Sequence, residues 1–203
     1  MFALVEDNKI TQMPKGNKGI RIGDNQYPAA IYTLWTEAER NEIGIYTVEI
    51  DESNKKDEEW YINTNITYSF ADNKVTGSYG TATAKEIEDT DATDEEGNKL
   101  KDENGNQIIV DGLKTIKKKY IDNQCAGILQ PSDWRVIRAK ETGGTINSSW
   151  KTWRASVRTK CNSMQDQIDA VSNVDELKDL FTYTKQEDGT VKRPLGEFPT
   201  KDD

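Results

Sequence analysis

Histidine is absent from this chain of 203 residues, and only two cysteines are present. Without histidine, neither a Ser-His-Asp triad nor a Cys-His pair can form, and two cysteines cannot complete a four-cysteine zinc site. The sequence also has no phosphate-binding glycine loop and no GxSxG nucleophile motif. It therefore predicts a protein that is not an enzyme and that carries no metal ion or cofactor.

Long apolar runs are missing as well. Hydrophobic residues make up 34% of the chain, below the roughly 45–50% that globular domains usually have. No run approaches the ~18 apolar residues of a membrane-spanning helix, and the first residues lack the basic and apolar regions of a secretory signal. We therefore expect no membrane association and no export. The low apolar content indicates either that the domains are small or that a partner protein covers part of the surface.

Positive charge is scarce in the first half of the chain. Residues 1–110 carry 11 Lys and Arg against 22 Asp and Glu, whereas residues 111–203 carry 16 against 14. Because an acidic surface repels phosphate groups, nucleic acid is not an expected partner. The most acidic segment, residues 86–111, lacks the spacing of an EF-hand, which favours solvated turns over a calcium site.

Alternating apolar residues predict short strands in the first part of the chain. These strands are expected at residues 2–6, 20–22 and 45–50. The strongest local pattern is a β-hairpin within residues 60–84. Its turn at Asp72-Asn73 would pair Phe70 with Val75 and would place the large apolar side chains on one face.

A short helix is predicted from the residues at its two ends. Thr36 and Glu39 fit a capping box, in which each side chain bonds the backbone N–H of the other residue. Gly44 stands where a left-handed residue would end the helix. Residues 8–19 are polar and contain Pro14 and two glycines, so they are predicted to form a loop.

After residue 112 the apolar period lengthens to between three and four, which predicts helices. We expect helices at about residues 113–129, 132–142, 149–171 and 174–181, and then a hairpin around Asp188-Gly189. Asp111 and Ser132 are expected to cap the first two helices. Four lysines are expected on the polar face of the first helix: Lys114, Lys117, Lys118 and Lys119.

These patterns predict an α+β protein with three parts. Residues 1–85 are expected to form a β-rich N-terminal domain with hairpins. Residues 112–203 are expected to form a small helical bundle that ends in a short hairpin. Between them, residues 86–111 form an acidic, turn-rich linker or hairpin. Two similar units in this segment, Glu96-Gly97-Asn98 and Asn104-Gly105-Asn106, are either hairpin tips or parts of a flexible loop.

Three of the five tryptophans fall where the predicted helices would meet. They either fill a core between these helices or form an exposed aromatic groove for a partner. The favoured interpretation buries the three rings and leaves the flanking arginines at the rim, where they stack on the rings, pair with carboxylates of a partner or face solvent. The candidate partner-binding residues here are Trp134, Arg138, Trp150, Trp153, Arg154 and Arg158.

The two cysteines, Cys125 and Cys161, lie on the apolar stripes of two predicted helices. We interpret them as small buried hydrophobic side chains with reduced thiols, because the cysteine count is low and no secretion signal is present. A disulfide that joins the two helices is the alternative.

Two short motifs in the helical part resemble a known family. Residues 129–138 read LQPSDWRVIR, and residues 150–158 read WKTWRASVR. Together they are similar to the C-terminal module of tailed-bacteriophage tail assembly chaperones and tail-fibre assembly proteins. That module carries Thr-Asp-Trp in its first motif, and tryptophan, tyrosine-arginine and leucine-arginine in its second. Ser132, Trp153 and Val157 stand where the family has threonine, tyrosine and leucine. The similarity covers about residues 113–160.

This resemblance implies a function without catalysis. A member of the family would assist the folding or trimerisation of a tail fibre, or would stay in the virion as a structural connector. Its partners would be tail-fibre or baseplate proteins, and homo-oligomers are a further expectation. Its location would be the host cytoplasm during assembly or the tail of the virion.

An alternative hypothesis treats the chain as a virion module that binds glycans of the host surface. Trp60 and Tyr61 lie near the start of a predicted strand, where one of the two side chains must point outward. An exposed ring at this place would offer a stacking platform for a sugar. A hydrolase that uses paired carboxylates such as Glu58-Glu59 is a third hypothesis. It is weak, because 36 acidic residues make chance pairs unavoidable.

Overall fold

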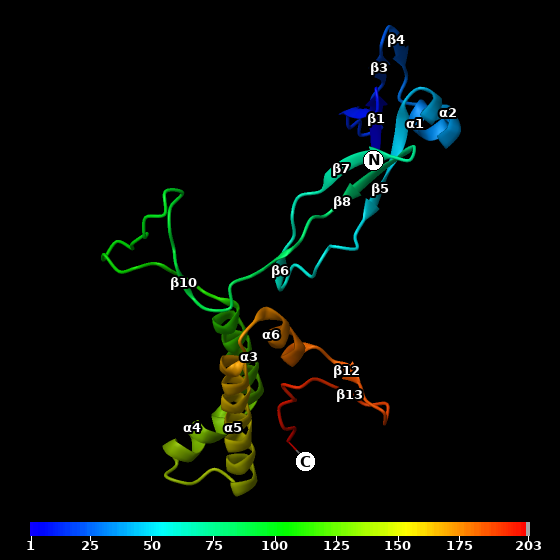
Figure 1. Ribbon diagram of the computed structural model, residues 1–203. Coiled ribbons are helices and arrows are strands. Elements are labelled where there is room, and N and C mark those ends of the chain that lie inside the picture. The colour runs from blue at the N-terminus through cyan, green and yellow to red at the C-terminus, as the bar shows by residue number, and fades with distance from the viewer. Residues whose placement is uncertain (202–203) are drawn as a thin grey trace. The chain divides into compact units, whose positions relative to one another are not determined.

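The structure, a computed structural model, describes residues 1–201. Strands occupy the first part of the chain, helices occupy the second, and a short hairpin follows the last helix (Figure 1). The predicted α+β class, with a β-rich N-terminal region and a helical C-terminal region, is therefore confirmed. The chain divides into two compact units, Met1–Thr83 (unit 1) and Ala84–Asp203 (unit 2).

Unit 1 is built on a five-stranded sheet. Its strands are β1 (Phe2–Glu6), β2 (Lys9–Gln12), β5 (Ile45–Asp51), β7 (Thr67–Ala71) and β8 (Lys74–Ser78). The strand order is β2-β1-β5-β8-β7, in which only β5 and β8 run parallel. The predicted hairpin register is confirmed, since Phe70 lies opposite Val75 across a turn at Asp72 and Asn73, whose φ angles are 51° and 60°.

The prediction of a loop over residues 8–19 is wrong in its first part, because β2 forms there. Asp7 and Asn8 have φ angles of 50° and 59°, the left-handed pair that a tight two-residue hairpin turn needs. This turn places Ile10 opposite Val5. The same Asp-Asn dipeptide closes the β7–β8 hairpin, so the turn signal was present in the sequence, and the polar residues around it concealed the strand.

Smaller elements complete unit 1. They are β3 (Ile20–Ile22), β4 (Asn25–Tyr27), α1 (Ile31–Leu34), α2 (Glu37–Glu42) and β6 (Tyr61–Ile62), which pairs with β9 (Thr83–Ala84). The capping box of α2 is confirmed: the Glu39 N–H donates to Thr36 Oγ1 at 3.3 Å, and the Thr36 N–H donates to Glu39 Oε2 at 2.7 Å. Gly44 follows with a φ of 83°. No periodic signal predicts α1, because four residues are too few to show one.

Both faces of the five-stranded sheet carry buried side chains. Ala3 and Leu4 are neighbours on β1, so they point to opposite faces. The cluster on the Leu4 face also draws on β3 and α1, and comprises Leu4, Ile20, Ile31, Tyr32 and Ile45. The cluster on the Ala3 face comprises Ala3, Val48 and Val75. Unit 1 therefore has a core of its own around β1 and β5.

Near the start of unit 2, residues 90–110 form a three-armed structure that we call the acidic lobe. One arm is the antiparallel pair of β10 (Thr90–Asp91) and β11 (Ile109–Val110). The other two arms are hairpins within residues 93–99 and 101–107, each closed by one β-bridge. The two similar units of the sequence are therefore hairpin tips, which was one of the two predicted alternatives.

Three residues spaced eight apart join the arms of the acidic lobe. The N–H of Leu100 donates to the carbonyl of Ala92 at 2.8 Å, the N–H of Ile108 donates to Leu100 at 3.0 Å, and the N–H of Ala92 donates to Ile108 at 2.8 Å. These bonds close a ring, so each arm leaves and re-enters the same junction.

One aspartate fixes each hairpin tip of the lobe. Asp94 Oδ1 accepts the backbone N–H groups of Glu96 and Asn98, at 3.0 and 2.8 Å, and Asp102 repeats this arrangement eight residues later. Gly97 adopts a φ of 85°, which a side chain would disfavour. The donated hydrogen bonds, led by the Asn98 side chain in the first tip, hold the pKa of both aspartates below its ordinary value.

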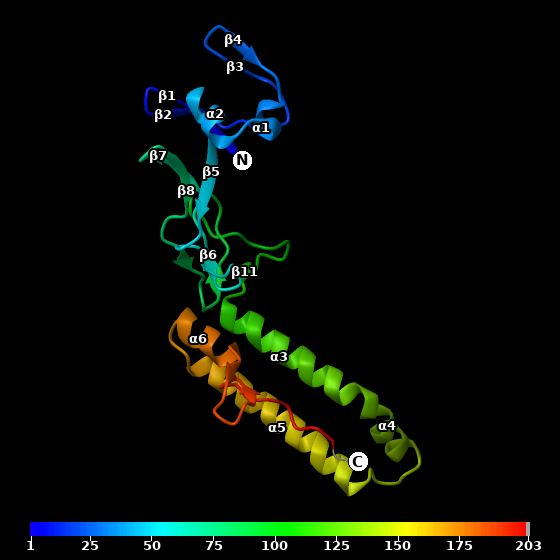
Figure 2. The same cartoon turned by 90° about the vertical axis from the view of Figure 1, so that its right-hand side faces the viewer.

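The rest of unit 2 is helical and ends in the predicted hairpin. Its elements are α3 (Leu113–Leu129), the 3-10 turn η1 (Gln130–Ser132), α4 (Asp133–Glu141), α5 (Ser148–Ala170), α6 (Val174–Phe181), β12 (Thr184–Lys185) and β13 (Val191–Lys192). Helices α3 and α5 lie side by side (Figure 2). Side chains buried on these two helices include Ile121, Cys125, Val157, Cys161 and Met164. Both cysteines are free thiols, so the interpretation as buried reduced residues is confirmed.

The N-terminus of α3 is capped by backbone groups and not by Asp111, so that prediction is wrong. The carboxylate of Asp111 pairs with a lysine further along the helix. The N–H groups of Leu113 and Lys114 donate to the carbonyls of Glu86 and Ile87, both at 3.0 Å. The segment before the lobe therefore supplies the acceptors that the first turn of α3 requires.

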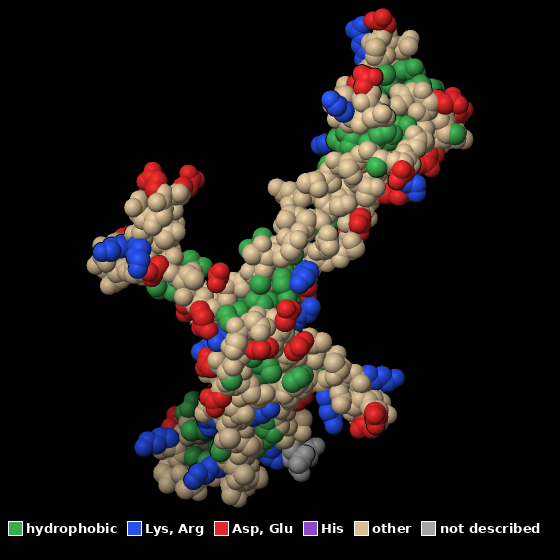
Figure 3. Space-filling view, in the orientation of Figure 1, with side chains coloured by type: hydrophobic (Ala, Val, Ile, Leu, Met, Phe, Trp, Pro, Cys, Tyr) green, Lys and Arg blue, Asp and Glu red, His purple; other side chains and the backbone are tan. Residues whose placement is uncertain are grey.

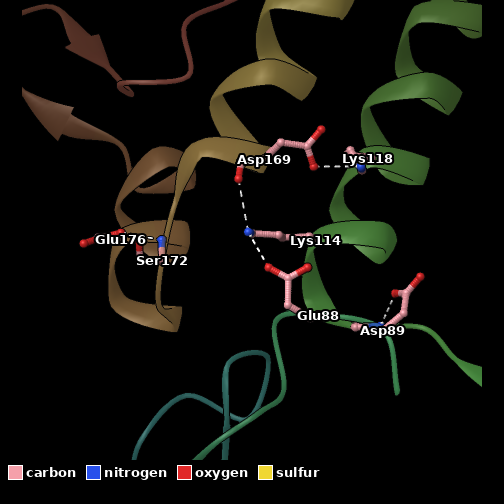
Figure 4. A network of polar contacts seen from close by, with 8 residues as sticks. Glu88, Asp89, Lys114, Lys118, Asp169, Ser172 and Glu176 are labelled. Atoms are coloured by element: carbon pink, nitrogen blue, oxygen red, sulfur yellow. Dashed lines mark hydrogen bonds and ion pairs between the residues drawn. The ribbon is translucent and has the colours of Figure 1, made fainter. Parts of the chain in front are cut away.

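Two of the lysines predicted to face solvent, Lys114 and Lys117, are buried. Figure 4 shows Lys114 Nζ between Glu88 Oε1, at 2.5 Å, and the carbonyl oxygen of Asp169, at 3.1 Å. Lys118 Nζ lies 2.8 Å from Asp169 Oδ1. These contacts join the start of α3 to the end of α5. Long aliphatic stems allow such lysines to be buried while their ammonium groups find polar partners.

Candidate functional site

The end of the helical hairpin, where α4 meets the start of α5, exposes large apolar side chains. No residue of α4 is buried, and Trp134 and Ile137 are 49% and 57% exposed. They lie three residues apart, on one face of the helix. A surface helix normally buries its apolar side against the rest of the fold. Helix α4 does not, so its apolar side chains are left uncovered on the surface of unit 2.

Cation–π contacts order the rings at this end. The guanidinium of Arg135 lies 4.6 Å from the centroid of the Trp134 ring and 4.3 Å from that of Trp150. Trp150 in turn meets Trp153 edge to face, with centroids 5.5 Å apart. The Trp153 indole N–H donates to the carbonyl of Pro199 at 3.0 Å. The sandwiched arginine thus joins α4 to α5 and holds the two outer rings in place.

A shallow hollow lies between α4 and α5. Its volume is about 180 Å³, and its lining includes Trp134, Arg138, Thr142, Ile146 and Trp150. Pockets for substrates and cofactors usually enclose roughly 300–1,000 Å³. The hollow therefore has room for a side chain of a partner and is small for a substrate. We define the Trp-Arg surface as four residues that line the hollow, Trp134, Arg135, Arg138 and Trp150, together with the exposed Ile137 of α4.

The expectation that three indole rings fill a core between the helices is wrong. Trp134 is half exposed, and Trp150 and Trp153 are only half-buried. Aliphatic and sulfur-containing side chains, among them Val157 and Met164, occupy the interface of α3 and α5 instead. The tryptophans come after the end of α3, beyond the region where the two long helices face each other, so little protein is available to cover them.

Arg154 was expected at the rim, and it is buried with 5% exposed. One guanidinium nitrogen, Nη1, donates to the carbonyl of Leu129 at 2.8 Å and to Ser132 Oγ, while Nη2 lies 2.6 Å from Asp133 Oδ1. Arg154 thus holds the turn between α3 and α4 from the middle of α5. It is a structural residue and presents no charge to a partner.

The Arg154 contacts also explain why Ser132 does not cap α4 as predicted. Its hydroxyl donates to the carbonyl of Leu129 at 2.7 Å and accepts from Arg154, so it makes no capping bond to α4. Arg158, one turn further along α5, is exposed, and its Nη1 donates only weakly to the Arg154 carbonyl, at 3.4 Å. Of the predicted arginines, Arg138 and Arg158 therefore offer charge to a partner.

Trp60 and Tyr61 lie in unit 1, where β6 begins, and neither points outward as expected. Their exposed fractions are 3% and 5%. The ammonium group of Lys56 also lies 4.2 Å above the Tyr61 ring. The sugar-stacking platform that the glycan hypothesis requires is therefore missing at these two residues.

The sequence placed Arg135 among the flanking arginines that could stack on these rings, and in the structure it stacks on both Trp134 and Trp150. Its signal was its place directly after Trp134 at the start of a helix, although spacing alone does not reveal that Trp150 would approach its other face. Within residues 1–201, no three His, Cys, Asp or Glu side chains gather as metal ligands would. The arrangement of rings and guanidinium groups is suited to binding protein side chains.

No helix in the described part of the chain, residues 1–201, has both the length and the apolar character to cross a bilayer. Comparisons of the chain with protein-family models, with curated proteins and with solved structures found no match.

Proposed function

We propose that this chain is a non-enzymatic docking protein of a bacteriophage tail, which assists the assembly of tail fibres or connects parts of the tail. The observation that carries the proposal is the Trp-Arg surface, on a helix that buries none of its residues. Aromatic and arginine side chains are the residues most enriched where protein interfaces derive their binding energy. The assignment to a bacteriophage tail rests on the resemblance of the two motifs at residues 129–138 and 150–158 to the tail assembly family.

In this proposal each unit of the chain binds a partner through its own surface. Unit 2 docks through the Trp-Arg surface to a tail protein or to a second copy of the chain. Unit 1 contacts a tail-fibre or baseplate protein. The low hydrophobic content of the chain, 34%, supports such a role, because a partner would bury part of the surface. The corresponding location is the host cytoplasm during assembly, or the virion tail if the protein remains there.

The proposal is tested by mixing the purified chain with each tail-fibre and baseplate protein encoded beside its gene. Light scattering after gel filtration would report the mass of any complex. The variant with Trp134→Ala and Ile137→Ser should weaken docking by about 30-fold, the effect of losing an interface hot spot. Both side chains are about half exposed, so the variant should keep its fold.

A matched control is Leu34→Ser, which replaces an exposed apolar side chain of unit 1. It should leave docking through unit 2 unchanged. A chain that forms no complex with any tail protein would refute the role in the tail. Complexes that the double variant forms as tightly as the unaltered chain would refute docking through the Trp-Arg surface. Mass spectrometry of purified virions would then distinguish a transient assembly factor from a connector.

A further inference from the structure

We infer that the Trp-Arg surface of one copy of this chain binds the acidic lobe of another copy, so that copies join head to tail. This inference rests on the proposed role of the Trp-Arg surface in docking and names its occupant. Charge, exposed apolar residues and the geometry of unit 2 carry it.

The helical end that bears the Trp-Arg surface is strongly basic. Residues 130–160 contain seven Lys and Arg against two Asp and Glu. Arg154 forms the ion pair with Asp133, whereas Arg138 and Lys151 are exposed and form no ion pair within residues 1–201. Figure 3 shows Lys and Arg side chains around α4 at this end of unit 2. This excess of charge favours an acidic partner.

The acidic lobe has the complementary character. It carries six Asp and Glu against two Lys, and Figure 3 shows acidic side chains at one of its tips and Lys side chains on another arm. Glu95 and Glu103 stand in these tips, are exposed and form no ion pair among the residues that the structure describes. Four apolar side chains of the lobe are also exposed by about two fifths to one half: Leu100, Ile108, Ile109 and Val110. Rings and aliphatic groups on the two surfaces can therefore pack while the charges pair.

The lobe cannot reach the Trp-Arg surface of its own chain. The lobe directly precedes the start of α3, and the Trp-Arg surface follows its end (Figures 1 and 2). A helix of 17 residues separates the two by roughly 25 Å. The contact must therefore join two copies. A single contact of this kind leaves one surface of each type free, so further copies can add head to tail into an open chain.

Sedimentation velocity of the purified chain alone tests this inference. At low salt the average mass should rise with concentration past that of two copies. It should fall back at 1 M salt, where the screening length shrinks from about 10 Å to about 3 Å. The lobe variant Glu95→Lys with Glu103→Lys, and the helix variant Arg138→Glu with Lys151→Glu, should each associate at least about tenfold more weakly. All four side chains are exposed and form no ion pair within residues 1–201.

Mixing the two variants provides the decisive measurement. The lobe variant keeps a normal Trp-Arg surface, and the helix variant keeps a normal lobe. Together they should form a complex of two chains that cannot grow further. The control variant Glu42→Lys with Glu49→Lys makes the same change of charge as the lobe variant, but on exposed residues of unit 1. It should associate like the unaltered chain.

A chain that stays monomeric at low salt up to millimolar concentration would overturn the inference. So would association that neither variant weakens, or variants that fail to complement each other. These outcomes leave the proposed function intact if complexes with tail proteins still form. Conversely, self-association without any tail complex would support the inference and refute the role in the tail.

Discussion

At the scale of single residues, a buried arginine holds α3, α4 and α5 together, a role that the sequence suggested for the tryptophans. Arg154 bonds three groups around the turn between α3 and α4. A signal for its burial was available: it lies four residues after Trp150 and three before Val157, on the apolar stripe of α5. Its positive charge predicted an exposed position at the rim of the tryptophan cluster, because burial of a cation is costly unless polar partners surround it.

Replacement of Arg154 by alanine should lower the free energy of unfolding by about 2–4 kcal/mol, because the Leu129 carbonyl and the Ser132 hydroxyl each lose the bond that Arg154 donates. Arg158→Ala is the matched control, since this arginine is exposed one turn away, and it should change stability by less than about 0.5 kcal/mol. Urea unfolding followed by circular dichroism measures both. Equal effects of the two substitutions would contradict the structural role of Arg154.

The thiol of Cys161 should be unreactive in the folded chain. Burial, with help from the neighbouring Cys125 and Asp122, raises the pKa of Cys161 from 9.0 to about 12. The thiolate that reacts with disulfide reagents is therefore scarce. Labelling with a chromogenic disulfide should be slow until the chain unfolds. Rapid labelling of Cys161 under native conditions would contradict this prediction.

The raised pKa of Cys161 also predicts a loss of stability in alkali. Between about pH 9 and pH 12 the folded chain keeps the thiol proton and the unfolded chain loses it. The unfolded state then binds fewer protons, so the free energy of unfolding falls as the pH rises through this range. Cys161→Ala should remove this part of the pH dependence, as urea titrations at a series of pH values would measure.

At the scale of elements, two glycines of helix α3 differ in the space around them: Gly112 is the N-cap residue, and Gly127 lies near the end of the helix. A Cβ on Gly112 would lie 2.3 Å from the carbonyl carbon of Glu88, whereas a Cβ on Gly127 would meet no atom within 4 Å. Gly112→Ala should therefore destabilise the chain by about 1–3 kcal/mol. Gly127→Ala should stabilise it by about 0.5–1 kcal/mol, because alanine favours the helix. Thermal unfolding of the two variants should shift in opposite directions.

Elements with local signals were predictable. The β7–β8 register, the capping box at Thr36 and the long helices all follow from turn residues, caps and apolar periods within a few residues. The N-terminus of α3 was not predictable, because its acceptors come from residues 86–87, on the far side of the acidic lobe in sequence. The three-armed form of the lobe likewise depends on a ring of bonds between residues eight and sixteen apart in sequence, which no short window contains.

At the scale of the whole molecule, the net charge of −9 sets which partners can approach. We expect the chain not to retard duplex DNA at physiological salt, with a dissociation constant weaker than about 10⁻⁴ M, despite its basic helical end. A gel-shift titration measures this. A shift at lower concentration, lost in the variant with Arg138→Glu and Lys151→Glu, would show that the basic end binds phosphates.

The candidate site was only partly predictable at this scale. The two motifs brought Trp134, Arg138 and Trp150 together as candidates, and these residues do line one hollow. Whether rings fill a core or face solvent depends on how much protein packs over them, which is a property of the whole unit. The same limit applies to Trp60 and Tyr61, because strand alternation predicted one outward ring and the fold covers both.

The ring of hydrogen bonds through Ala92, Leu100 and Ile108 fixes the two ends of each hairpin arm. A change in the length of an arm therefore leaves the path of the chain beyond it unaltered. An epitope or a fluorescent label inserted beside Gly97 would extend one arm and leave its two ends where they are. Such an insertion would report on the motion of unit 2 without disturbing the first turn of α3.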